Sequence, residues 1–341
     1  MFLLTMKNII YFFLFLNLVN QMTSYSKNDI EKFVSDISTA KAIIIGAGAG
    51  LSTSAGFYLS GERFDKYFFD FKKKYNIHDM YSGSFYPYSK KSEYWAFMSR
   101  NIYLNRFAPM PKNTYNILYE IFKDKNYFIL TTNVDHLFQK VGFDKNRLYY
   151  MQGDMGLLQC KKPCHFKNYD NYNIIKNMLL DQGFNFDEKG ELISNNNIKS
   201  EISENIVPKC LKCGGEMDFN LRIGNNFVQD EGWYEHQTLY TNFIEKYKND
   251  DILYIELCVG YNTPSIIKYN FWNKVAENKK AKIISINLEK SDIPEKIKNR
   301  SLIITGDANE VLHKIYSLIN ENKDKNDLYF IYYNHIMNFL F

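Results

Sequence analysis

Residues 41–64 read KAIIIGAGAGLSTSAGFYLSGERF, and this stretch decides the predicted fold. Its apolar run, Ala42 to Ile45, predicts a buried strand that leads into a glycine-rich turn, Gly46 to Gly50, at the start of a helix. Glycine permits positive φ and lets backbone amides approach a ligand closely. Exposed N–H groups and the helix dipole then favour an anion, typically a pyrophosphate. The stretch therefore favours a nucleotide site, with an ordinary tight turn as the alternative.

The spacing of these glycines differs from that of a plain dehydrogenase. Gly46, Gly48 and Gly50 are followed by small polar residues before Gly56. The usual dinucleotide-binding pattern is G-x-G-x-x-G, in which each glycine has a fixed role. We therefore expect a nucleotide site that is built differently.

Length and charge limit the classes of protein to which the chain can belong. Its 341 residues suffice for one large domain, or for a large and a small one. The net charge is only +4, the basic residues are scattered, and the sequence has no long basic tract. A nucleic-acid binder usually concentrates its basic residues, so we expect no nucleic-acid partner.

Apolar runs alternate with helical patterns along the chain. The runs cover residues 42–45, 126–132, 253–259, 282–287 and 301–305, and the helical patterns cover 28–40, 64–81, 86–103 and 115–122. This alternation predicts an α/β fold with a parallel sheet and helices on both faces. Ligands of such folds bind beyond the carboxyl ends of the strands. Each run ends in polar or small residues, so we expect one shared cleft there.

The cysteines predict a metal centre. Cys160 and Cys164 form a C-x3-C pair, and Cys210 and Cys213 form a C-x2-C pair. Such knuckles suit tetrahedral zinc, and four thiolates leave no open position, so the predicted zinc is structural. It would hold an inserted module over residues 155–220, the alternative being four buried free cysteines. Cys258 lies in a predicted strand, and we expect it in the core.

The two ends of the chain stand apart from this pattern. Residues 1–25 are apolar at first and are either a signal-like segment or the result of an early start codon. The cysteine use favours a reducing compartment, so we expect a cytoplasmic protein, with targeting as the alternative. Residues 321–341 form an aromatic-rich tail, which we expect to be an added helix or a disordered end.

Single polar residues at the strand ends allow two readings each. Asn133 and Asp135 follow the second apolar run and can reach into a cleft together, or they can simply cap a helix. His136 is expected on a helix surface rather than as a base. Gln152, taken alone, is a loop residue, and Glu289 either accepts from ribose hydroxyls or is a surface carboxylate.

The order of the motifs is more specific than any one of them. It runs Gly-Ala-Gly-x-Ser (48–52), Thr-x-Asn-x-Asp (131–135), Gln-Gly before C-x3-C, C-x2-C-Gly-Gly, Gly-x-Asn-Thr-Pro (260–264) and Ile-Asn-x-Glu (286–289). This order resembles the sirtuin family of NAD-dependent deacylases and ADP-ribosyltransferases over about residues 42–312. The chain is most similar to the macrodomain-linked (class M) sirtuins of microbes, with which it shares AGLSTSAGF, SGERF, DMYSGSFYP, YWAFMSR, QGDMGLLQC and the NTP segment ending in YNFW.

The resemblance implies a sirtuin-type catalytic domain over residues 26–320. It implies a Rossmann-like, doubly wound sheet and a smaller zinc domain, with NAD as co-substrate in the cleft between them. The pyrophosphate would contact Gly48, Ala49, Gly50, Ser52 and Gly56, with Arg63 on the loop that closes over it. The nicotinamide and its ribose would contact Asn133 and Asp135, and the adenosine side would contact Gly260, Asn262, Asn287 and Glu289.

Gln152 departs from the deacylase pattern. Sirtuin deacylases have a His at this position, which serves as general base for the NAD ribose. Gln has no titratable proton near neutral pH, so it can hydrogen-bond a ribose hydroxyl but cannot act as a base. Losing the base should slow deacylation by about 10²–10⁴-fold. ADP-ribosyl transfer needs only nicotinamide departure and capture of C1′ by an outside nucleophile.

We therefore expect an NAD-dependent protein mono-ADP-ribosyltransferase in which Asn133 and Gln152 orient the ribose and Asp135 the nicotinamide. The alternatives are a residual sirtuin deacylase and an NAD-binding or NAD-hydrolysing sensor. The resemblance also implies two partners. The acceptor would be a lipoyl-carrier protein of the glycine-cleavage H type, and a macrodomain hydrolase would reverse the modification.

Overall fold

The computed structural model describes residues 24–194 and 197–340. All but the last two residues of the predicted N-terminal segment, 1–25, therefore lie outside the described residues. The chain divides into two compact units. Unit 1 comprises residues 1–54, 113–130 and 243–341, and unit 2 comprises residues 55–112 and 131–242.

Unit 1 carries most of a parallel sheet. Its elements are α2 (Lys27–Thr39), β1 (Ala42–Ala47), α3 (Ala49–Ser54), α7 (Thr114–Phe122), β2 (Tyr127–Thr131), β9 (Ile252–Leu257), α11 (Lys268–Glu277), β10 (Lys282–Asn287), η4 (Glu295–Arg300), β11 (Ser301–Thr305) and α12 (Ala308–Leu340). Within the described residues the sheet order is β11-β10-β9-β1-β2, followed by β3 (Leu148–Tyr150), which is assigned to unit 2. The predicted apolar runs thus form the strands of this sheet.

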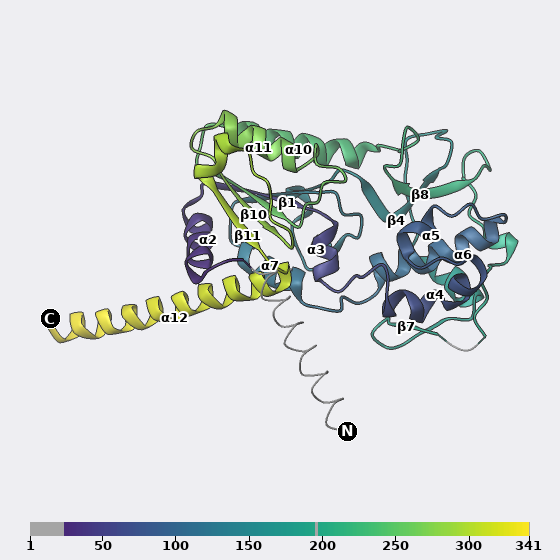
Figure 1. Cartoon of the computed structure of the whole chain (residues 1–341), viewed down its shortest axis with the longest axis horizontal. Helices are drawn as coiled ribbons and strands as arrows, with labels where there is room; N and C mark the ends of the chain where they lie inside the picture. The colour runs from purple at the N-terminus through teal and green to yellow at the C-terminus, as the bar shows by residue number, and fades with distance from the viewer. Residues whose placement is uncertain (1–23, 195–196, 341) are drawn as a thin grey trace, which may run out of the picture. The chain divides into compact units, whose positions relative to one another are not determined.

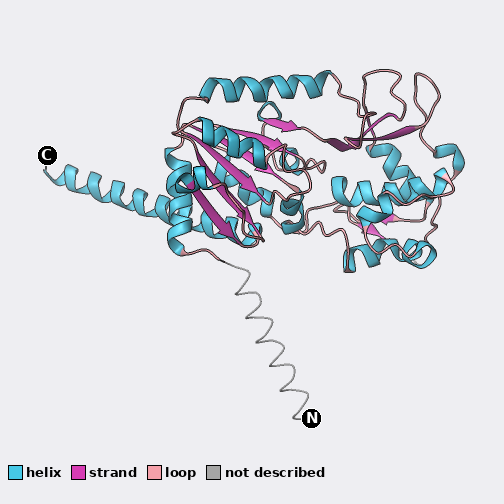
Figure 2. Cartoon of the chain, turned by 45° about the horizontal axis from the view of Figure 1, so that its top comes forward, coloured by secondary structure: helices cyan, strands magenta, loops and turns pink. Residues whose placement is uncertain are grey.

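Strand register explains why the strand ends come together. β1 pairs in parallel with β9, β9 with β10, and β10 with β11, so their carboxyl ends share one edge. Every residue of β1 and β9 is buried, which requires cover on both faces of the sheet. Helices supply that cover (Figure 2). The predicted α/β fold with a doubly wound parallel sheet is confirmed.

Unit 2 combines helices with small antiparallel sheets (Figure 1). Its helices are α4 (Glu62–Tyr75), α5 (Met80–Ser84), α6 (Lys91–Ile102), the π-helix η1 (Tyr103–Phe107), α8 (Leu137–Lys140), η2 (Lys145–Arg147), α9 (Tyr172–Asp181), η3 (Glu204–Ile206) and α10 (Glu231–Tyr247), whose last residues belong to unit 1. Its strands besides β3 are β4 (Gly153–Cys160), β5 (Tyr169–Asp170), β6 (Asn185–Phe186), β7 (Leu192–Ile193) and β8 (Met217–Leu221). The helix predicted over 64–81 is in fact two helices, α4 and α5.

Aromatic side chains form the core of unit 2. The rings of Phe64 and Phe68 stack with centroids 5.0 Å apart, and Phe68 lies 4.7 Å from Phe97. All three side chains are fully buried. Burying such rings supplies a large part of the stabilisation of a domain of this size.

Candidate functional site

The glycine-rich turn of unit 1 packs directly on the chain that follows β9. A Cβ on Gly48 would lie 2.6 Å from the backbone oxygen of Cys258, and one on Gly50 would lie 2.8 Å from the Cys258 Cβ. The Gly48 amide also donates to Leu257 O at 3.0 Å. Glycine is therefore required here for close approach. The prediction of a positive φ at this turn is wrong, because the glycine with a positive φ, 93°, is Gly56, further along the chain.

The predicted pyrophosphate residues lie at the start of α3 and after it. Ala49 and Gly50 are exposed, Ser52 is half-buried, and its hydroxyl lies 3.4 Å from that of Tyr115. In unit 2, a Cβ on Gly56 would lie 2.7 Å from the Cβ of Pro111. The pyrophosphate contacts of these residues stay a prediction.

The sequence analysis expected Arg63 on a loop. In the structure it lies in the first turn of α4. Its guanidinium donates to the side-chain oxygen of Asn105 at 2.8 Å and to the backbone oxygens of Leu104 and Tyr58 at 2.5 and 3.2 Å. Burial lowers the pKa of Arg63 to about 10, so the group keeps its charge at neutral pH. Arg63 thereby fixes the segment before α4 to η1.

The predicted adenosine residues gather at the carboxyl ends of β9 and β10. Asn287 donates to Val259 O at 3.1 Å and accepts from the amide of Leu288 at 2.9 Å. It therefore ties the end of β10 to the segment that carries Gly260. Gly260, Asn262 and Glu289 are exposed. Cys258, next to this segment, is buried, as predicted, and burial raises the pKa of its thiol to about 12.

Asn133 and Asp135 line one recess of unit 2. Both are only 7% exposed, and Gly153, next to Gln152, lines the same recess. Asp135 also accepts from the amide of Leu137 at 3.1 Å, so the alternative capping role is present too. The structure thus brings together Asn133, Asp135 and Gly153, the residue that follows Gln152.

The backbone around Gln152 is held rigidly. Its carbonyl accepts from the amide of Arg222 at 3.0 Å, and Gly153 pairs with Leu221 of β8. Gly153 has φ 95°, and a Cβ there would lie 2.2 Å from Asn220 O, so only glycine fits. Gln152 is half-buried, and its backbone is tied to β8 immediately before the glycine that lines the recess.

Three ionisable residues lie at or next to this recess, where His136 and Arg106 contact Asp154, and the sequence did not predict these contacts. His136 precedes α8 with φ 60°, and its Nδ1 lies 2.8 Å from Oδ2 of Asp154, so it is not a helix-surface residue. Arg106 donates from Nε to Oδ1 of Asp154 at 2.7 Å. Burial alone would raise the pKa of Asp154, but His136 and Arg106 outweigh it and hold that pKa well below its usual range. The only signal in the sequence was the QGD triplet itself.

The four paired cysteines form one cluster. Their Sγ atoms all lie within 4.8 Å of one another, which fits a tetrahedral metal ion such as zinc. Cys160 ends β4, and Cys210 and Cys213 precede β8, its antiparallel partner. Backbone amides, that of Cys213 first, lower the pKa of Cys210 to about 6 and so favour a thiolate. The predicted metal ligands are therefore placed together, with no open position among them.

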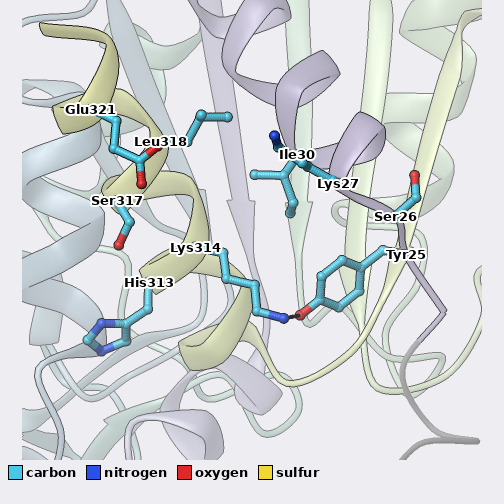
Figure 3. Close-up of a pocket in the computed structure, with 9 residues that line it drawn as sticks. All are labelled: Tyr25, Ser26, Lys27, Ile30, His313, Lys314, Ser317, Leu318 and Glu321. Atoms are coloured by element: carbon cyan, nitrogen blue, oxygen red, sulfur yellow. Dashed lines mark hydrogen bonds between the residues drawn. The ribbon is translucent and has the colours of Figure 1, made fainter. Parts of the chain in front are cut away.

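A separate groove lies in unit 1, between the start of α2 and α12 (Figure 3). There the Lys314 ammonium donates to the Tyr25 hydroxyl at 2.9 Å. None of the predicted site residues lines this groove.

Among the residues that the structure describes, no helix has both the length and the apolar character needed to cross a membrane.

The chain is similar in sequence to known proteins. It is 33% identical over 277 residues, 81% of its length, to a protein ADP-ribosyltransferase of Staphylococcus aureus, of which the match covers 83%. It is 26% identical over 240 residues, 68% of its length, to a probable bifunctional ADP-ribose hydrolase/ADP-ribosyltransferase of Fusarium oxysporum, of which the match covers 38%. No protein-family model matches the chain.

Solved structures show the same fold. A Sir2 enzyme in complex with a p53 peptide and NAD+ superposes with a TM-score of 0.53 at 15% identity, covering 85% of this chain and 98% of that one. This likeness assigns the fold, and the Staphylococcus aureus relative assigns the family. The chain belongs to the sirtuin-type protein ADP-ribosyltransferases.

Proposed function

We propose that this chain transfers ADP-ribose from NAD to a protein acceptor and that Gln152 is the residue that separates it from a deacylase. The observation that carries the proposal is the position of this amide. Gln152 precedes Gly153, which lines the recess of Asn133 and Asp135, and the motif that resembles that of the deacylases has this amide in place of the base. An amide orients a hydroxyl by hydrogen bonds but does not remove its proton.

The proposed roles follow from the chemistry of each side chain. Asn133 and Gln152 hydrogen-bond the hydroxyls of the nicotinamide ribose, and Asp135 faces the nicotinamide. Positioning lowers the barrier to nicotinamide departure, and fixed dipoles stabilise the positive charge that develops at C1′. The acceptor's nucleophile then forms the new bond to C1′.

The remaining NAD contacts are proposed for the strand ends. The amides at Ala49 and Gly50 hold the pyrophosphate, with Gly48, Ser52 and Gly56 beside it, and Arg63 fixes the segment that follows. Gly260, Asn262, Asn287 and Glu289 contact the adenosine. The Sir2 enzyme solved with NAD+ and a peptide supports both a dinucleotide and a protein substrate on this fold.

Zinc has a structural role in this proposal. Cys160, Cys164, Cys210 and Cys213 would hold the ion, which supplies no chemistry to the transfer because all four positions are filled by thiolates. It stabilises the loops around β4 and β8 in a zinc module over residues 155–220.

Two partners complete the proposal. The acceptor is a lipoyl-carrier protein of the glycine-cleavage H type, as the likeness to the class M sirtuins implies. A macrodomain hydrolase removes the modification. Support for the second partner comes from the bifunctional Fusarium oxysporum relative, whose name joins a hydrolase to a transferase and of which the chain matches 38%.

Mass spectrometry tests the function directly. The full-length, zinc-loaded protein is incubated with NAD and either the lipoylated carrier, the unlipoylated carrier or an acetylated peptide. We expect ADP-ribose on the lipoylated carrier and an equal amount of nicotinamide released. Formation of O-acyl-ADP-ribose would indicate a deacylase instead, and NAD loss without modified protein would indicate a hydrolase.

A further inference from the structure

A groove on unit 2 is lined by basic side chains. It is formed by Arg106, Phe107, His136, Gln139, Lys140 and Lys145, and none of these carries a carboxylate. His136 and Gln139 also line the recess that holds Asn133 and Asp135. The basic groove therefore adjoins the recess in which we place the chemistry.

The positive charges of this basic groove are only partly compensated. Asp154, behind it, lies against Arg106 and His136. Lys140 instead donates to the backbone oxygens of Phe107 and Ala108, at 3.1 and 2.6 Å. These carbonyls satisfy its N–H groups but do not neutralise its charge.

The basic side chains of the groove also affect one another's charge. Burial is the main cause that lowers the pKa of Lys140 below its ordinary value, repulsion by the nearby charge of Arg106 lowers it further, and the carboxylate of Glu191 opposes both. Lys145 is exposed, and the carboxylate next to it in the sequence, that of Asp144, pairs with Arg147 at 3.7 Å. A carboxylate in the basic groove would relieve this repulsion and would be attracted from a distance.

We propose that the basic groove is the docking site for acidic side chains of the acceptor protein. The inference rests on the proposed function and adds the chemistry of the substrate surface to it. Contact of the acceptor's carboxylates with Lys140, Lys145 and Arg106 brings the acceptor to the recess that His136 and Gln139 share with the basic groove. The acceptor is thus selected by negative charge near its modified residue.

A binding measurement tests this without relying on catalysis. A fluorescein-labelled peptide of Glu and Gly residues, and a matched peptide of Gln and Gly, are titrated with the full-length protein, and fluorescence anisotropy is followed. We expect the Glu peptide to bind and the Gln peptide to bind far more weakly. Added salt should weaken binding of the Glu peptide, because exposed charges are screened.

Variants locate the binding surface. Lys145→Glu combined with Lys140→Gln should weaken binding of the Glu peptide by about tenfold, the effect of losing a few exposed ion pairs. The matched control is Lys73→Glu, which reverses an exposed lysine on α4 and should leave binding unchanged. Lys145→Glu is also tested alone. The Lys145 ammonium makes no described contact that the fold needs, so weaker binding in this variant cannot be ascribed to misfolding.

Other outcomes overturn the proposal. Equal binding of the two peptides, or equal loss in Lys73→Glu, would show that the basic groove does not select carboxylates. Calorimetry in which Lys145→Glu weakens NAD binding, with peptide binding intact, would assign the basic groove to a phosphate of the dinucleotide. Glu-peptide binding that depends on Lys145, in a protein that modifies no acceptor, would instead refute the proposed transferase function.

Discussion

Arg100 and Asp70 form a two-point ion pair inside unit 2, with Nη1–Oδ1 at 2.6 Å and Nη2–Oδ2 at 2.8 Å. The Arg100 side chain is fully buried, and Asp70 is 12% exposed. The remaining N–H groups donate to Gln182 Oε1, Tyr67 O and Lys199 O, each at 2.8 Å. The guanidinium has five donors, and all five have acceptors. This single side chain therefore links α4, α6 and the segments that follow α9.

Arg100→Met should destabilise the protein by about 3–5 kcal/mol, because it leaves the partly buried Asp70 carboxylate and two carbonyls without their donors. Denaturant unfolding measures the change. Lys72→Met is the control, since it breaks an ion pair with Asp65 whose side chains are 42% and 51% exposed. Such an exposed pair is worth up to about 1 kcal/mol. Equal losses in the two variants would contradict the structural role of Arg100.

Cys213→Ser should abolish tight zinc binding and lower the thermal stability of unit 2, because serine is a poor zinc ligand and metal binding contributes to folding. Zinc content after gel filtration is the measurement. Cys258→Ser is the matched control, since Cys258 is buried elsewhere and should not affect zinc. A Cys213→Ser protein with full zinc content would refute the four-cysteine centre.

Gly48→Ala should destabilise unit 1 and weaken NAD binding, because the new Cβ would lie 2.6 Å from a backbone oxygen that cannot easily move. Calorimetry with NAD and thermal unfolding measure both effects. At Gly232, in α10, a Cβ would meet its nearest atom at 3.6 Å, so Gly232→Ala should be neutral or stabilise by about 0.4–1 kcal/mol. If Gly48→Ala behaved like Gly232→Ala, the turn would not be tightly packed.

Gln152→His should reduce ADP-ribosyl transfer and introduce some deacylation, because it adds a group that can take a proton from the ribose hydroxyl. The products with NAD and an acetylated peptide, separated by mass spectrometry, report the change. Gln237→His on α10 is the control and should leave the products unchanged. Unaltered transfer together with no O-acyl-ADP-ribose would show that Gln152 does not decide the reaction.

Asp154 should make stability depend on acid pH. Its pKa is lowered in the folded protein, so its contribution is present above the unfolded value of about 4 and is lost as the pH falls through the folded value. The free-energy difference between wild type and Asp154→Asn should therefore be largest near neutral pH and shrink below about pH 4. Asp292→Asn, at an exposed position, serves as the control. A pH-independent difference would argue against the ion pairs with His136 and Arg106.

The sequence could predict those parts of the fold that depend on local pattern. The runs 282–287 and 301–305 are the strands β10 and β11. The four middle residues of β10 are buried, as a continuous apolar run requires, whereas buried and half-buried residues alternate in β11, the last strand in the sheet order. The cysteine spacing placed the metal ligands for a similar reason, since each pair comes from one short loop. Helix α10 and strand β4 were not predicted, because neither has a clear apolar period.

The charged residues around Asp154 could not be found in this way. His136 lies 18 residues before Asp154 in the sequence, and Arg106 is separated from it by 48 residues. Only the folded chain brings them together. The glycine-rich turn was predicted at the right place, but the positive φ expected there was wrong. Glycine is needed for positive φ at Gly56 and for close packing at Gly48, and the sequence alone does not distinguish these two roles.

The π-helix η1 has a consequence for the directions of the side chains that it carries. Consecutive residues of a regular α-helix point about 100° apart, and a π-turn inserts one extra residue into that series. Within η1, Asn105 accepts from Arg63 while its neighbour Arg106 pairs with Asp154. Deleting a single residue from η1 would restore α-helical phase and turn both side chains away from their partners. The extra residue thus positions the side chains of Asn105 and Arg106 together, and straightening the helix would break both contacts.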